Sequence, residues 1–206
     1  FFQEKGITVA HVVPGVRFAL KAQEAGVDAV VAEGFEAGGH NGRDETTTFC
    51  LIPMVKKEIN IPLIAAGGIG SGKGMLSAMT LGADGIQMGS RFVASEEASS
   101  HLNFKNEVIK AKDGATHLTL KDVTPVRLMK NKFYHEIHAA ISSGATPEEQ
   151  KAILGRGRAK KGMFEGDLEN GELEIGQIAG IIHEIKPAKQ VLQEIVQEFE
   201  EVKKSL

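Results

Sequence analysis

EAGVDAV (residues 24–30) and LGADGIQ (residues 81–87) are two versions of one short turn, and each leads into an apolar run. Such runs predict parallel strands at Ile7–Val13, Val27–Ala32, Ile61–Ala66 and Gly85–Met88. Helical apolar spacing fills the intervals at Val16–Glu24, Thr47–Glu58 and Lys73–Leu81. Strands that are apolar on both faces and joined by helices form parallel βαβ units. The tight repeat favours an α/β fold of the (β/α)8 TIM barrel type over a doubly wound sheet.

The domain organisation follows from counting these units. A complete barrel takes about 250 residues, whereas the sequence shows four βα units, so residues 1–95 are predicted to be its C-terminal half, with N-terminal strands missing. Residues 96–206 are predicted to form a helical extension that packs on the barrel and returns near the ligand site. Its expected helices are Glu96–Lys112, Pro147–Leu154, Gln177–Glu184 and Ala188–Lys203.

Composition excludes several classes of protein. With 42% hydrophobic and 25% charged residues and a formal net charge of -3, the 206 residues predict a globular chain that binds neither nucleic acid nor membrane. No apolar run approaches the roughly 20 residues of a membrane span. One cysteine, Cys50, fits a reducing cytoplasm, and its apolar neighbours predict that it is buried.

A glycine-rich loop carries the first candidate site. VAEGFEAGGHNG, Val31–Gly42, directly follows a predicted strand and contains His40. Glycines let a backbone approach a flat or anionic ligand closely, and histidine is the residue type that ordinarily titrates near neutral pH. The loop therefore predicts a catalytic or ligand-facing histidine, with a mobile surface loop as the alternative.

Two further glycine loops predict a phosphate site. AAGGIGSGKG, Ala65–Gly74, follows a strand and opens a helix, where backbone N–H groups and the helix dipole favour an anion. An NTPase loop is excluded because Gly74 stands where Ser or Thr would hold magnesium. In GADGIQMGSRF, Gly82–Phe92, Gly89 and Ser90 again follow a strand. Paired loops after the last two strands form the phosphate site of many barrels; two unrelated tight turns are the alternative.

These motifs have a family likeness. EAGGHNG, AAGGIGSG, GADGIQMGSRF and GQIAG (Gly176–Gly180), in this order, resemble the FMN-dependent nitronate monooxygenase (2-nitropropane dioxygenase) and enoyl-ACP reductase II family. The resemblance implies an FMN-binding barrel with His40 as the catalytic residue. It implies phosphate binding by Gly67, Gly68, Gly89 and Ser90, and places Glu33, Gly38, Gly39, Gln87 and Met88 along the flavin.

The resemblance leaves two branches open. Position 33 is commonly glutamine in the monooxygenases, whereas Glu33 and the acidic segment GDLENGELEIGQIAG look like the reductases. This favours reduction of trans-2-enoyl thioesters, free or bound to acyl carrier protein, with NADH or NADPH in fatty acid synthesis. Oxidation of alkyl nitronates with O2 is the alternative. A flavin-free enzyme acting on a sugar phosphate and a non-catalytic flavin-binding protein are the readings from other classes.

Other polar residues carry weaker expectations. Arg156, Arg158, Lys160 and Lys161 form a basic loop that would meet a carrier protein or nicotinamide phosphates, or would simply be solvated. His11 is expected to be a hydrogen-bonded interior residue of its strand, with a position facing the flavin pocket as the alternative. The later histidines lack metal-ligand spacing, so no transition metal is predicted. The amphipathic helix at 191–206 suits either a homodimer or packing on its own barrel.

Overall fold

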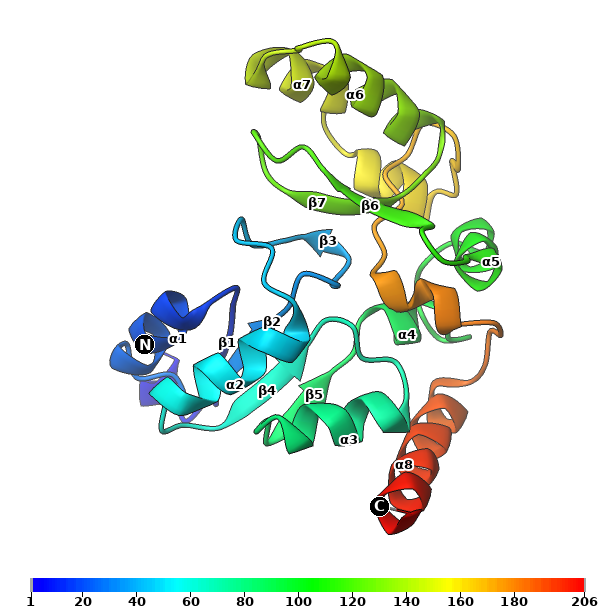
Figure 1. Ribbon diagram of the computed structural model, residues 1–206. Helices are drawn as coiled ribbons and strands as arrows, with labels where there is room; N and C mark the ends of the chain where they lie inside the picture. The colour runs from blue at the N-terminus through cyan, green and yellow to red at the C-terminus, as the bar shows by residue number, and fades with distance from the viewer. Residues whose placement is uncertain (1, 206) are drawn as a thin grey trace. The chain divides into compact units, whose positions relative to one another are not determined.

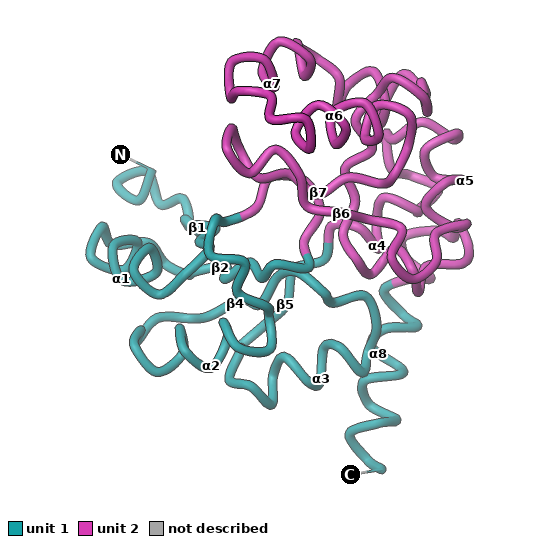
Figure 2. Tube along the Cα trace, turned by 45° about the horizontal axis from the view of Figure 1, so that its top comes forward, with its two compact units in different colours: residues 1–36, 42–88, 192–206 teal, residues 37–41, 89–191 magenta. Residues whose placement is uncertain are grey.

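A computed structural model describes residues 2–205 of the chain, which divides into two compact units (Figure 2). Unit 1 comprises Phe1–Glu36, Gly42–Met88 and Leu192–Leu206, and unit 2 comprises Ala37–Asn41 and Gly89–Val191. These limits differ from the expected boundary at residue 95, because the C-terminal helix groups with the parallel strands and the His40 loop groups with the later residues.

Unit 1 contains a four-stranded parallel sheet (Figure 1). Its strands are β1 (Ala10–Val13), β2 (Ala29–Glu33), β4 (Leu63–Ala66) and β5 (Gly85–Gln87), in the order β1-β2-β4-β5. The connecting helices are α1 (Val16–Glu24), α2 (Thr48–Glu58) and α3 (Gly72–Thr80), and a 3-10 turn covers Gln3–Lys5. The strands follow chain order without the reversal of a doubly wound sheet, as in a barrel. All four predicted strands are present.

The repeated turn has a shared physical basis. Asp28 and Asp84 each precede a strand, and each carboxylate accepts a hydrogen bond from a backbone N–H at the start of the neighbouring strand. The donors are Val9 N, at 2.7 Å, and Leu63 N, at 2.9 Å. Hydrogen bonds from Lys56 and from Leu63 hold the pKa of Asp84 below its ordinary value. The aspartate in each copy of the repeat therefore fixes the register between adjacent parallel strands.

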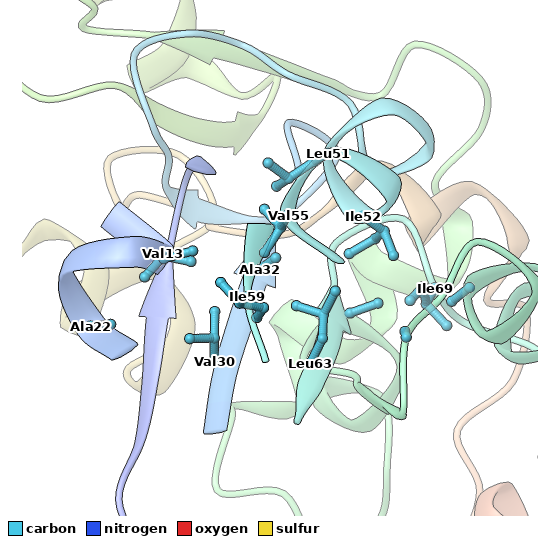
Figure 3. Packing of buried hydrophobic residues seen from close by; sticks show 14 residues of the cluster. Val13, Ala22, Val30, Ala32, Leu51, Ile52, Val55, Ile59, Leu63 and Ile69 are labelled. Carbon is cyan, nitrogen blue, oxygen red and sulfur yellow. The ribbon is translucent and has the colours of Figure 1, made fainter. Parts of the chain in front are cut away.

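The core of unit 1 lies between this sheet and its helices. Figure 3 shows Val30 and Leu63 of the strands facing Leu51, Ile52 and Val55 of α2, all of them buried. The prediction that Cys50 is buried is wrong, because Cys50 is exposed. The buried positions of α2 are Thr48, Leu51, Ile52 and Val55, the i, i+3, i+4, i+7 stripe of a helix, and Cys50 falls outside it.

Unit 2 contains several helices and a three-stranded antiparallel sheet in the order β3-β7-β6. The strands are β3 (Gly39–His40), β6 (Thr116–Thr119) and β7 (Val126–Met129). The helices are α4 (Ser90–Val93), α5 (Leu102–Lys110), α6 (Lys132–Ser142) and α7 (Pro147–Leu154), with a π-helical turn at Lys160–Phe164 and a 3-10 turn at Gln177–Ile181. Sequence patterns did not predict these strands, because polar residues interrupt each of them.

The last helix, α8 (Ala188–Ser205), is the longest in the described chain. Its residues Ile195 and Phe199 are buried, while Leu192 and Val196 are exposed. Among residues 2–205, no helix combines the length and apolarity that crossing a bilayer requires.

Candidate functional site

Unit 1 gathers five of the predicted flavin-binding residues at the carboxyl ends of three neighbouring strands. Glu33 of β2 is level with Ala66 of β4, and Ala66 is level with Gln87 of β5. Gly67 and Gly68 directly follow Ala66, and Met88 directly follows Gln87. Loops at this end of a parallel barrel carry the functional residues of that fold.

Helix α2 holds the Gly67–Gly68 turn through its residue Thr48. Both glycines have positive φ, 88° and 68°, which residues with a side chain rarely adopt. The hydroxyl of Thr48 donates to the carbonyl of Gly67 at 2.9 Å, and the Glu36 carboxylate accepts the Thr48 backbone N–H at 2.9 Å. The turn therefore has a fixed backbone, and Gly68 is exposed to solvent.

The expectation that the start of helix α3 holds a phosphate is wrong for the N–H groups of Gly72 and Gly74, which already have acceptors. The N–H of Gly72, its first residue, donates to the carboxylate of Glu198 at 2.6 Å, and the N–H of Gly74 donates to Ser71 Oγ at 3.1 Å. An anion already occupies this end of α3, so phosphate binding would fall to the preceding Gly67–Gly68 turn.

The other unit 1 residues differ in their surroundings. Gln87 is exposed, whereas Met88 is partly buried and packs against the hydrophobic core. Burial raises the pKa of Glu33 above its ordinary value of 4.5. The surroundings of Glu33 therefore oppose its ionisation.

Unit 2 fixes the His40 loop along one edge of β7. Gly39 is level with Arg127 and His40 with Val126, and the N–H of Asn41 donates to the Pro125 carbonyl at 2.9 Å. Arg127, only 1% exposed, donates from Nε to the Ala37 carbonyl at 3.1 Å. A sheet and a buried guanidinium therefore hold the loop backbone, while His40 itself remains exposed.

Three of the motifs from the sequence meet beside this loop. A Cβ atom at Gly38 would lie 2.7 Å from the Cα of Ile175, and closer still to the backbone N of Gly176. The N–H of Gly176 donates to Ser90 Oγ at 2.8 Å. The glycine loop, the Ser90 segment and the Gly176–Gly180 motif are therefore one packed cluster within unit 2. Gly89, next to Ser90, is exposed and has open space around it.

Sequence analysis did not single out Glu172 and Glu174, and the second of them lies near His40. Glu174 forms an antiparallel bridge with Leu128 of β7, and its Oε2 lies 2.8 Å from where a Cβ on Gly39 would be. Burial raises the pKa of Glu174, and attraction to His40 offsets part of the rise. The alternation Glu172-Leu173-Glu174-Ile175, with both apolar residues buried, was the available signal in the sequence. Arg127 carried no such signal.

Glu172 leads to a prediction about stability. Burial, and then repulsion from Glu174, raises its pKa from 4.5 to about 7. A carboxyl whose pKa is raised by folding stabilises the fold below its unfolded pKa, and this stability is lost as pH rises through the folded value. Glu172→Gln should therefore stabilise the protein above pH 7, by at most about 3 kcal/mol, and have little effect near pH 4. Thermal melts from pH 4 to 8 measure this difference, and a constant offset across the range would contradict it.

His11 and Arg158 depart from expectation. His11 is exposed on β1 rather than interior. His117 of β6 lies 5.9 Å from His138 of α6 between ring centroids, and burial, together with nearby positive charge, lowers its pKa. Arg158 is not a free surface charge: it donates to the carbonyls of Ile153, Leu154 and Asn170 and lies over the Phe133 ring at 4.3 Å.

Comparison with known proteins gives a consistent result. A model of the nitronate monooxygenase family matches residues 2–198. A probable nitronate monooxygenase of Bacillus subtilis is 32% identical over 192 residues, which cover 89% of this chain and 55% of that protein. One of Staphylococcus saprophyticus is 35% identical over 146 residues, covering 66% of this chain and 41% of that protein.

Solved structures agree on the fold. FabK from Thermotoga maritima is 41% identical with a TM-score of 0.93, over 99% of this chain and 64% of that one. A nitroalkane oxidase from Streptomyces ansochromogenes is 26% identical with a TM-score of 0.82, over 98% of this chain and 60% of that one. The predicted TIM-barrel class is confirmed. The chain spans about two fifths to two thirds of the length of these relatives.

Proposed function

Because the chain belongs to the nitronate monooxygenase family, we propose that it acts as an FMN-dependent oxidoreductase with His40 as its catalytic residue. The observation that carries this proposal is the construction of the His40 loop. Its backbone is paired with β7 and bonded to the buried Arg127, while the imidazole is exposed beside Glu174. A rigid backbone that presents an accessible histidine suits a group that must meet a substrate in one orientation.

The residues proposed to hold FMN fit such a group. Gly67 and Gly68 form a fixed turn with its second residue exposed, and Gly89 has open space where a side chain would stand. We assign phosphate binding to Gly67 and Gly68, and the family resemblance implies the same role for Gly89 and Ser90. Glu33, Gly38, Gly39, Gln87 and Met88 are assigned to the rest of the flavin, with Gly38 and Met88 acting through the packing described above. FMN, when bound, would supply the hydride or electron transfer that no amino-acid side chain provides.

Within the family we favour reduction of an enoyl thioester by NADH or NADPH. Glu33 supports this branch, as does the similarity to FabK, an enoyl-ACP reductase II, at 41% identity. His40 would then donate a hydrogen bond to the thioester carbonyl oxygen and a proton to the enolate that develops there. Glu174, beside it, would hold the imidazole in place for that transfer.

Nitronate oxidation is the second candidate, because the curated relatives carry that name. In this reading His40 removes the acidic α-proton of a nitroalkane or orients a nitronate that arrives without it. No nicotinamide is required. The same histidine serves both reactions, so its placement alone does not separate them.

An anaerobic absorbance experiment separates the two branches. The purified protein loaded with FMN is mixed with NADH or NADPH and then with a short trans-2-enoyl thioester. We expect rapid bleaching by the nicotinamide and recovery on addition of the thioester. If the nicotinamides leave the flavin oxidised while an alkyl nitronate bleaches it, the reductase assignment is overturned and the monooxygenase takes its place.

Carrier-protein recognition is proposed for Arg156, which is exposed, unlike the internally bonded Arg158. Arg156→Glu should lower kcat/KM on a carrier-bound thioester several-fold, because a reversed charge at the rim of an interface slows association with an acidic partner. Turnover of a small thioester should not change. Lys57→Glu, at an exposed position of α2, is the matched control. Equal effects on both substrates would refute a carrier contact.

A further inference from the structure

The C-terminal helix packs directly on the first residue of α3. A Cβ atom at Gly72 would lie 2.5 Å from the Ile195 carbonyl oxygen and 2.8 Å from the Glu198 carbonyl carbon, both on α8. Only a glycine lets the two backbones approach this closely. Ile195 and Phe199, on the same face of α8, are buried. The start of α3 is therefore built around a helix that lies more than 120 residues later in the chain.

Glu198 adds a hydrogen bond to this packing. Its carboxylate accepts the Gly72 N–H at 2.6 Å, while Ser71 Oγ accepts the Gly74 N–H two residues on. The first turn of a helix has N–H groups without helical partners and a positive end of the dipole, so a carboxylate there is favourable. Charge-assisted bonds of this kind are about twice as strong as neutral ones.

The hydrogen bond between Glu198 and Gly72 fixes the chain that follows the Gly67–Gly68 turn. Thr48 holds the other end through its bond to the Gly67 carbonyl, and only Ile69, Gly70 and Ser71 separate Gly68 from Gly72. We propose that Glu198 is a positioning residue for flavin binding: by anchoring Gly72 it sets the conformation of the turn that grips the FMN phosphate. This inference rests on the proposed FMN binding and adds the C-terminal helix to the cofactor site.

Two ligands that differ only by the phosphate test this role. Dissociation constants for FMN and for riboflavin are measured by flavin fluorescence on the apoprotein of the wild type, Glu198→Ala, Glu198→Gln and Glu200→Ala. Glu200 is exposed on the same helix and provides the matched control. Circular dichroism melts report whether each variant folds.

Glu198→Ala should weaken FMN binding several-fold, because the chain after the Gly67–Gly68 turn loses its anchor at Gly72, and leave riboflavin binding within about twofold. Glu198→Gln keeps an acceptor oxygen and should lose less; if the alanine variant does not fold, this variant carries the test. Glu200→Ala should match the wild type.

Equal weakening of FMN and riboflavin would show a general structural role and overturn the proposal, as would unchanged FMN binding in both Glu198 variants. A wild type that binds FMN no more tightly than riboflavin would instead overturn the proposed phosphate site, and this inference with it. The wild-type ratio thus separates the two failures.

Discussion

His40→Ala should lower turnover by about 10²- to 10⁴-fold, the usual contribution of a positioned general acid or base, with FMN still bound. The imidazole is exposed while the backbone on either side is held by β7 and Asn41, so its removal should leave the loop in place. Steady-state kinetics on the substrate identified by the anaerobic experiment measure the loss, and the flavin spectrum reports retention of the cofactor.

The control for this variant is His11→Ala. His11 is an exposed histidine of β1 and has no assigned role. It should leave turnover close to that of the wild type. Full turnover of the flavin-loaded His40→Ala protein would refute a catalytic role for His40, and the glycine loop would then be a structural or flavin-contacting element only.

Gly38→Ala should be the most destabilising substitution in the candidate site. The added methyl would overlap the backbone of Ile175 and Gly176, and backbone atoms cannot move aside as a flexible side chain does. Overpacking of this kind costs about 3 kcal/mol, which lowers the melting temperature by roughly 10 °C in a chain of this size. Thermal denaturation followed by circular dichroism measures the shift.

Gly89→Ala is the comparison for stability. Nothing lies within 4 Å of its added Cβ and its φ is -97°, so its melting temperature should stay near that of the wild type. If the Gly38 and Gly89 variants melt together, the contact between the His40 loop and the Ile175–Gly176 backbone does not contribute to the fold. If only Gly38→Ala is unstable, the glycine at position 38 of the motif is required at least in part for packing.

Residue patterns were sufficient for the parallel half of this protein. The two aspartate turns, the apolar runs and the helical spacing determined four strands and three helices, because each depends on neighbours within about 20 positions. The glycine motifs likewise located His40 and the Gly67–Gly68 and Gly89–Ser90 segments. These features are local, so the sequence alone carries them.

Tertiary structure decided what surrounds these residues. The buried Arg127 behind the His40 loop, the surroundings of Glu174 and the capping of α3 by Glu198 all depend on contacts between distant positions. A charged side chain is read from sequence as a surface group, since burial of a charge is costly without a partner. Here the partners lie as far as 126 positions along the chain, so only the folded backbone brings them together.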